Sequence, residues 1–239
     1  MGSMQEFLRF FGHGFCHQIP ARSLEAGGVV FSACARDTGI YLGFFFALVV
    51  AFIIYARVKG KPTELPPALY VVVLVLLVLP MAFDGVTSYL GLRPTTNMIR
   101  YLTGFLAGVA VGSVVVPLLF ALRKDAVPGQ RIFARPSMVA PHLALTFALG
   151  AVFFVTYPYL GLVAPLVPVG AFLTITVCVN LILLTLSRRF APRHTAAHWL
   201  FLLALCLILA LVEIALFGAI RDMVVQVLLN GHEFSEFLS

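Results

Sequence analysis

Five residues near the N-terminus have types and spacings suited to binding a metal ion. His13 and Cys16 are three residues apart, and His17 follows Cys16 directly. Cys34 and Asp37 repeat the three-residue spacing. Two sulfur ligands, one nitrogen and one oxygen suit tetrahedral zinc. We therefore predict a zinc site formed by Cys16, Cys34, Asp37 and either His13 or His17, which compete for one ligand position.

The number of ligands decides what such a site would do. Four protein ligands make a structural site, whereas three ligands and a water make a catalytic one. A disulfide between Cys16 and Cys34 is an alternative, because an outer-face location permits one. Inert buried thiols are a further alternative, and this is our interpretation of Cys178 and Cys206.

Arginine side chains form a second group. Guanidinium groups bind carboxylate or phosphate through paired hydrogen bonds. We predict that an anionic ligand is bound by Arg22, Arg36, Arg93, Asn97 and Arg100. The alternative is that ion pairs of Asp84 with Arg100 and of Asp37 with Arg36 only hold helix ends together.

Two acidic residues lie inside or at the end of apolar segments. Ionisable groups in a membrane span are costly and are functional candidates for that reason. We predict that these two residues meet the Cys/His group and the arginine group in one pocket at the outer face of the membrane. Asp84 and Glu213 would transfer protons there. Asn180 is expected to form a hydrogen bond between helices. The histidines on the other side, His142 and the pair His194 and His198, are weaker metal candidates, and we interpret the pair as solvated.

The composition determines which elements must position these residues. Of the 239 residues, 61% are hydrophobic and 11% are charged, and the mean hydropathy is +1.03. Soluble domains are about half apolar and about a quarter charged, and one core could not hide this much apolar surface. The sequence therefore predicts an integral membrane protein and excludes disordered, collagen-like and disulfide-rich secreted classes.

Uncharged segments long enough to span a membrane give the architecture. A helix needs about 20 largely apolar residues to span the hydrocarbon core. Such segments cover residues 38–56, 65–83, 101–122, 136–187 (two helices separated by prolines) and 199–220. We predict an all-α bundle of six transmembrane helices at 38–229, after an outer segment at 1–37 with a short interfacial helix. Residues 230–239 are expected to form an outer tail.

Basic residues in the predicted loops set the orientation. Cytoplasmic loops are enriched in Lys and Arg, and basic residues follow the first, third and fifth predicted helices. Both termini are therefore expected outside. The net charge of +6 is a topology signal, so we expect membrane lipids as partners and no nucleic acid. Glycines four apart, at Gly39 and Gly43 and at Gly104 and Gly108, are interpreted as helix-packing positions.

Two sequence blocks resemble a known family. The first is Cys16-His17-Gln18-x-Pro20-x-Arg22-Ser23 with Cys34-x-Arg36-Asp37-Thr38-Gly39-Ile40-Tyr41-x-Gly43, and the second is Asp84-Gly85 through Arg93 to Asn97-x-x-Arg100 and Thr103-Gly104. The pattern is similar to that of a bacterial family of uncharacterised membrane proteins, domain of unknown function 2085. The resemblance implies a six-helix membrane fold in the bacterial cytoplasmic membrane and no established activity. Many members have cysteine at the position of Asp37.

These observations lead to two main functional hypotheses. The first is a zinc-dependent membrane enzyme that acts at the outer face on an anionic or phosphorylated lipid. The second is a non-enzymatic transporter or lipid-binding protein, in which the Cys/His cluster is a structural zinc site or a disulfide. A third, weaker hypothesis is an accessory subunit of another membrane protein.

Overall fold

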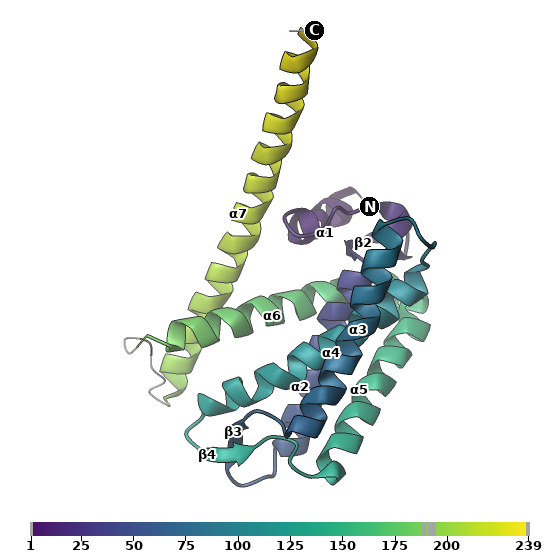
Figure 1. Ribbon diagram of the computed structural model, residues 1–239. Helices are drawn as coiled ribbons and strands as arrows, with labels where there is room; N and C mark the ends of the chain where they lie inside the picture. Colours follow the sequence, from purple (N-terminus) through teal and green to yellow (C-terminus); the bar gives the residue numbers. More distant parts are fainter. Residues whose placement is uncertain (1, 188–189, 191–194, 238–239) are drawn as a thin grey trace.

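The computed structural model describes residues 2–187, 190 and 195–237 and is a bundle of long helices (Figure 1). Six helices are long and apolar enough to span a membrane, as predicted. They are α2 (Ala35–Tyr55), α3 (Ala68–Tyr89), α4 (Asn97–Ala121), α5 (Pro136–Thr156), α6 (Leu166–Thr185) and α7 (Ala196–Phe237).

The ends of several helices differ from the predicted ends. α3 continues beyond Phe83, so Asp84 lies within the helix. α4 begins after Thr96, whose hydroxyl accepts a hydrogen bond from the Ile99 amide at 3.2 Å and caps the helix. The proline-containing break between α5 and α6 is two short 3₁₀ helices, Tyr157–Tyr159 and Gly161–Val163. α7 continues through residue 230 without a break, where a tail was expected.

Helices α2 and α4 are in direct backbone contact. A Cβ added at Gly39 would lie 2.2 Å from the carbonyl oxygen of Tyr101, and one added at Gly104 would lie 2.1 Å from that of Arg36. Gly43 and Gly108 are in equally close contact with the facing helix. Only glycine permits this approach, so the predicted packing role is confirmed. The contact fixes the first turn of α2 relative to that of α4.

Small elements cover the two ends of the bundle (Figure 1). At one end lie α1 (Gly2–His13) and an antiparallel hairpin of β1 (Ser23–Ala26) and β2 (Val29–Cys34). The hairpin turns at Gly27 and Gly28, both at positive φ. At the other end, β3 (Lys61–Glu64) pairs in parallel with β4 (Ala126–Arg131). The amphipathic helix was predicted, whereas the four strands were not.

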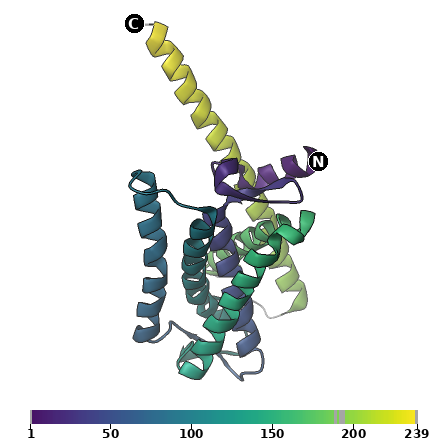
Figure 2. The ribbon, with the colours of Figure 1, turned by 90° about the vertical axis from the view of Figure 1, so that its right-hand side faces the viewer.

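Helices α3 and α7 lie at the periphery. α3 stands beside the other helices in Figure 2, and only Tyr70, Leu74 and Asp84 are buried among its residues. α7 packs against α6 and α1, and its C-terminal part projects away from the bundle (Figures 1 and 2). The polar end of the bundle is therefore enclosed by α1, the hairpin and the first turns of α2 and α4.

Candidate functional site

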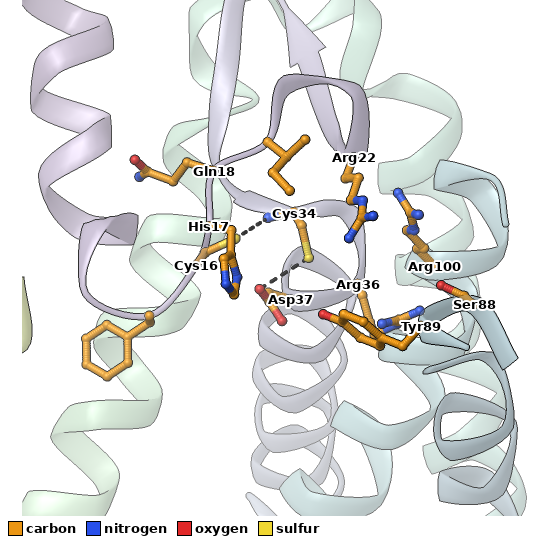
Figure 3. Close-up of a pocket in the computed structure, with 12 residues that line it drawn as sticks. Cys16, His17, Gln18, Arg22, Cys34, Arg36, Asp37, Ser88, Tyr89 and Arg100 are labelled. Carbon is orange, nitrogen blue, oxygen red and sulfur yellow. Dashed lines mark hydrogen bonds between the residues drawn. The ribbon is translucent and has the colours of Figure 1, made fainter. Parts of the chain in front are cut away.

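A polar cavity of about 230 Å³ lies where β2 leads into α2, at the end of the bundle that carries α1 (Figure 3). The segment after α1 and the first turn of α2 provide most of its wall, and the ends of α3 and α4 complete it. Its lining includes seven of the residues predicted for the site: Cys16, His17, Arg22, Cys34, Arg36, Asp37 and Arg100.

The sulfur and carboxylate groups of the pocket form one cluster. The Cys34 thiol donates a hydrogen bond to the Asp37 carboxylate at 3.2 Å, and the Cys34 backbone amide donates to Cys16 Sγ at 3.2 Å. The ligand atoms of Cys16, Cys34 and Asp37 all lie within 4.8 Å of one another. Both cysteines are free thiols. The arrangement therefore brings two sulfur atoms and one oxygen close enough to approach a single ion.

Local structure explains how these three side chains come together. Cys34 ends β2 and Asp37 lies in the first turn of α2, where a negative charge is favourable. Cys16 is positioned by its backbone, because its amide donates to Gly12 O at 2.8 Å and its carbonyl accepts from Arg221 of α7 at 2.8 Å. The Cys16 segment is thus fixed to α1 and α7.

The two thiols differ in acidity. The hydrogen bond between their side chains lowers the pKa of Cys16 and raises the pKa of Cys34, and burial and the Asp37 charge raise the Cys34 pKa further. Thiolate is the form that binds metals. Cys16 is therefore the more readily ionised of the two thiols.

Positive charge in the pocket is only partly compensated. The side chains of Arg22 and Arg100 extend into the cavity (Figure 3). In the part of the chain that the structure describes, neither guanidinium has a hydrogen-bond or ion-pair partner. Arg36 forms an ion pair with Asp84, but its buried Nε has no partner among the described residues. These groups can bind an anion through charge-assisted hydrogen bonds.

Asp84 lies outside the pocket wall and forms an ion-pair network with its neighbours. Its fully buried carboxylate accepts hydrogen bonds from Arg36, from Arg93 at 2.7 Å and from Thr95 at 2.8 Å. Asn97 donates to the carbonyl groups of residues 21 and 23 at 3.3 and 3.2 Å, which attaches the hairpin to α4. Asp84 thus forms ion pairs near the end of α3, but its partners are Arg36 and Arg93 and not the expected Arg100.

Two other predicted site residues are also placed elsewhere. His13 Nε2 lies 2.7 Å from Asp222 Oδ1 on α7, because α1 directs this side chain toward α7 and away from the thiols. Glu213 accepts a hydrogen bond from Asn180 at 3.2 Å, the helix–helix contact expected for Asn180. The expectation that all the polar residues meet in one pocket is therefore wrong for His13, Asp84, Arg93, Asn97 and Glu213.

The remaining histidines lie in different surroundings. His142 is fully buried, and its Nε2 lies 3.1 Å from the Ser113 hydroxyl. His198 follows the start of α7, and His194 lies outside the described residues. Tyr89, which was expected among the polar residues of the outer pocket, lines it. Ser88 also lines the pocket and was not predicted, because a serine at a helix end has no distinctive pattern.

A comparison with protein families finds a match to the segment that contains most of the pocket. A family model described as a predicted membrane protein (DUF2085) matches residues 16–114. An uncharacterised protein of Methanocaldococcus jannaschii is 38% identical over 108 residues, which cover 45% of this chain and 65% of the relative. The chain thus spans somewhat less than two thirds of that relative.

A second relative is an uncharacterised protein of Methanothermobacter thermautotrophicus. It is 36% identical over 96 residues, which cover 40% of this chain but 79% of the relative. No solved structure matches. Both relatives are archaeal, so the findings do not support the expectation of a bacterial family. The family match contains nearly the whole pocket lining and ends within α4.

Proposed function

We propose that this chain, which belongs to the DUF2085 family of predicted membrane proteins, is a zinc-dependent membrane enzyme that acts on a phosphorylated lipid. Zinc is bound by Cys16, Cys34 and Asp37. One observation carries the proposal: these three ligand atoms lie within 4.8 Å of one another in the wall of a cavity that also contains two arginines with no partner among the described residues, Arg22 and Arg100.

The chemistry follows from the number of ligands. Cys16, Cys34 and Asp37 would hold zinc with three protein ligands, and the metal would supply an activated water for hydrolysis. In the proposed reaction the oxygen of that water, having released a proton to solvent, bonds to phosphorus, the phosphorus–oxygen bond to the lipid breaks, and the leaving oxygen takes a proton. Arg22 and Arg100 neutralise the charge that develops on the phosphoryl oxygens.

The proton donor in this proposal differs from the one predicted from the sequence. Asp84 and Glu213 are bound to other groups outside the pocket, whereas His17 lines it. A histidine is suited to proton transfer near neutral pH. We therefore assign to His17 the donation of a proton to the leaving oxygen.

The proposed orientation places the pocket on the outer face of the cytoplasmic membrane. Basic residues gather at the opposite end of the bundle, where β3 and β4 lie, and include Lys59, Lys61, Arg123, Lys124 and Arg131. Such residues favour the cytoplasmic side. The archaeal origin of the relatives supports an archaeal type of cytoplasmic membrane for the family.

A non-enzymatic alternative is favoured by the position of His17. Its side chain extends into the same part of the pocket as Cys16 and Asp37 (Figure 3). If His17 is a fourth ligand, the zinc site is closed and structural. The protein would then be a transporter or lipid-binding protein with the same arginine pocket.

Metal content of the purified protein tests the proposal. We expect zinc in an equimolar amount in the wild type and its loss in Cys34→Ser. Cys206→Ser is the matched control, because Cys206 is a buried thiol on α7, and it should retain zinc. Absence of zinc from the wild type, with no saturable zinc binding after purification, would contradict the proposal.

His17→Gln separates the enzyme from the alternative. Release of inorganic phosphate from phosphatidic acid in nanodiscs is measured together with zinc content. Retained zinc with lost phosphate release supports the enzyme. Loss of zinc identifies His17 as a ligand of a closed site and overturns the catalytic role.

A further inference from the structure

An apolar groove continues from the polar pocket along α3. This second cavity has a volume of about 510 Å³. It shares Arg36 and Tyr89 with the polar pocket. The rest of its lining comes from one side of α3: Met81, Ala82, Gly85, Val86 and Leu90. A charged compartment and an apolar compartment thus meet at one arginine and one tyrosine.

The length of the groove matches a lipid chain within one leaflet. From Met81 to Leu90, α3 rises by about 14 Å at 1.5 Å per residue. One leaflet of the hydrocarbon core is about half of 30 Å thick. The groove therefore follows α3 over roughly the depth that a single chain occupies when its headgroup lies at the membrane surface.

The size and charge of the polar pocket restrict the headgroup. Its volume of about 230 Å³ is below the range of about 300–1,000 Å³ that is usual for drug-sized ligands, so only a small headgroup fits. Arg22 and Arg100 provide two positive charges that have no ion-pair partner among the described residues, and Asp37 is the one carboxylate in the lining of the same pocket. A phosphomonoester carries a charge of about −1.5 to −2 at pH 7, which matches the two arginines. A phosphodiester carries only one negative charge, and its second substituent needs additional space. The pocket therefore favours the monoester.

Gly85 leaves space in the groove and, unlike Gly39 and Gly104, is not needed for close packing of two helices. A Cβ at this position would meet only Arg36 Nη1, at 4.0 Å. Gly39 and Gly104, by contrast, are in contact with the backbone of the facing helix. Glycine at position 85 is therefore unnecessary for packing of α3, and its missing side chain leaves space in the groove.

We propose, building on the proposed function, that the ligand is a lipid phosphomonoester. Its phosphate lies between Arg22 and Arg100, and one hydrocarbon chain lies along Met81, Gly85 and Val86. Arg36 and Tyr89 surround the junction of headgroup and chain. The lipid enters sideways from the bilayer along α3, so its chain remains in an apolar environment while the phosphate reaches the pocket.

A leucine in the groove tests this assignment. Full-length Gly85→Leu is compared with Gly170→Leu, because Gly170 is also helical and an added Cβ there meets no atom within 4 Å. Binding of phosphatidic acid is measured in nanodiscs of phosphatidylcholine, and binding of glycerol phosphate is measured with the same samples. We expect Gly85→Leu to weaken phosphatidic acid binding about tenfold or more and to leave glycerol phosphate binding within about twofold of the wild type. Gly170→Leu should change neither.

Three outcomes would overturn the assignment. One is equal phosphatidic acid binding by Gly85→Leu and Gly170→Leu, because the chain then lies elsewhere. Another is equal binding of phosphatidylglycerol and phosphatidic acid by the wild type, because the pocket then does not select a monoester. Preferential binding of inorganic phosphate over both lipids would identify a soluble anion as the ligand and would also contradict the assignment.

A second substitution in the groove distinguishes loss of binding caused by a filled groove from loss caused by misfolding of Gly85→Leu. Ala82→Trp narrows the groove one helical turn away from Arg36, and it should reproduce the loss of phosphatidic acid binding. Zinc content is measured in every sample. Phosphatidic acid selectivity without zinc would disprove the proposed enzyme and leave the lipid site intact, so the two failures are distinguishable.

Discussion

Helices α3 and α4 have similar lengths and hydropathy but are packed in opposite ways. Fourteen of the 25 residues of α4 are buried, compared with three of the 22 residues of α3. α4 is in backbone contact with α2 through glycines, whereas at the pocket end α3 is held by ion pairs of Asp84 with Arg36 and Arg93. The pocket thus has one wall fixed by backbone contact and another, α3, whose Asp84 is joined to Arg36 of α2 by an ion pair.

The two walls meet two different requirements of the proposed function, a fixed metal site and an entry path for a lipid. Metal ligands must keep their mutual geometry, and Cys34 and Asp37 lie at the start of α2, which is in backbone contact with α4. A lipid must enter from the bilayer, and the apolar groove lies on the loosely packed helix. If this is correct, substitutions in the wall formed by α2 and α4 should affect overall stability and zinc binding, whereas loss of Asp84 should affect mainly α3.

The largest effect is expected where α2 and α4 touch. Gly104→Val places side-chain atoms against the backbone of Arg36, and overpacking of a core costs about 3 kcal/mol or more at such a contact. We expect a strongly lowered thermal unfolding midpoint in detergent and loss of zinc binding. Gly170→Val, on an open face of α6, should remain within about 0.5 kcal/mol of the wild type. Similar thermal midpoints for the two variants would contradict close backbone packing of α2 and α4 at Gly104.

A smaller, local effect is expected for Asp84→Ala. Removing one partner of a buried ion pair costs about 3 kcal/mol, because the remaining charges are left uncompensated. Since this carboxylate attaches α3, we expect faster hydrogen exchange at amides of α3 and little change in α2 and α4. Exchange that rises equally in all three helices would show that Asp84 stabilises the whole bundle.

Zinc affinity should depend on pH through Cys34. Binding requires thiolates and releases protons, and the hydrogen bond with Cys16 raises the pKa of Cys34. Lower pH therefore favours the protonated, metal-free form. We expect the affinity, measured by competition with a chelator, to fall by about tenfold or more between pH 8 and pH 6. An affinity that is constant over this range would exclude Cys34 as a ligand that must lose a proton.

The smallest effect is expected for His13→Ala. Its contact with Asp222 is largely exposed, and such pairs contribute about 0.2–1 kcal/mol. The thermal midpoint should fall slightly, and zinc content should stay at the wild-type level because α1 directs His13 toward α7. Loss of zinc from this variant would show that His13 is a zinc ligand.

The membrane spans were predictable because lipid imposes a minimum apolar length on each helix. The glycines at positions 39, 43, 104 and 108 also indicated close packing, since their spacing repeats along one helix face. The strands β3 and β4 were not predictable, because they are short, polar and more than 60 residues apart in sequence. Their pairing follows from the helices that bring the two loops together.

Part of the site was also predictable. The spacing of Cys34 and Asp37 spans one turn of chain at the start of α2, so local structure brings these side chains together. The pairing of Asp84 with Arg93 depends on the path of the loop between α3 and α4, and the sequence does not specify that path. The groove along α3 was missed because its apolar residues resemble those of any membrane helix.

Zinc K-edge X-ray absorption of the purified wild-type protein tests the central claim most directly. We expect two sulfur ligands at about 2.3 Å and oxygen or nitrogen ligands at about 2.0–2.2 Å, and loss of the metal in Cys34→Ser. Protein without zinc, or zinc with no sulfur ligand, would contradict the assignment of Cys16, Cys34 and Asp37 as a metal site.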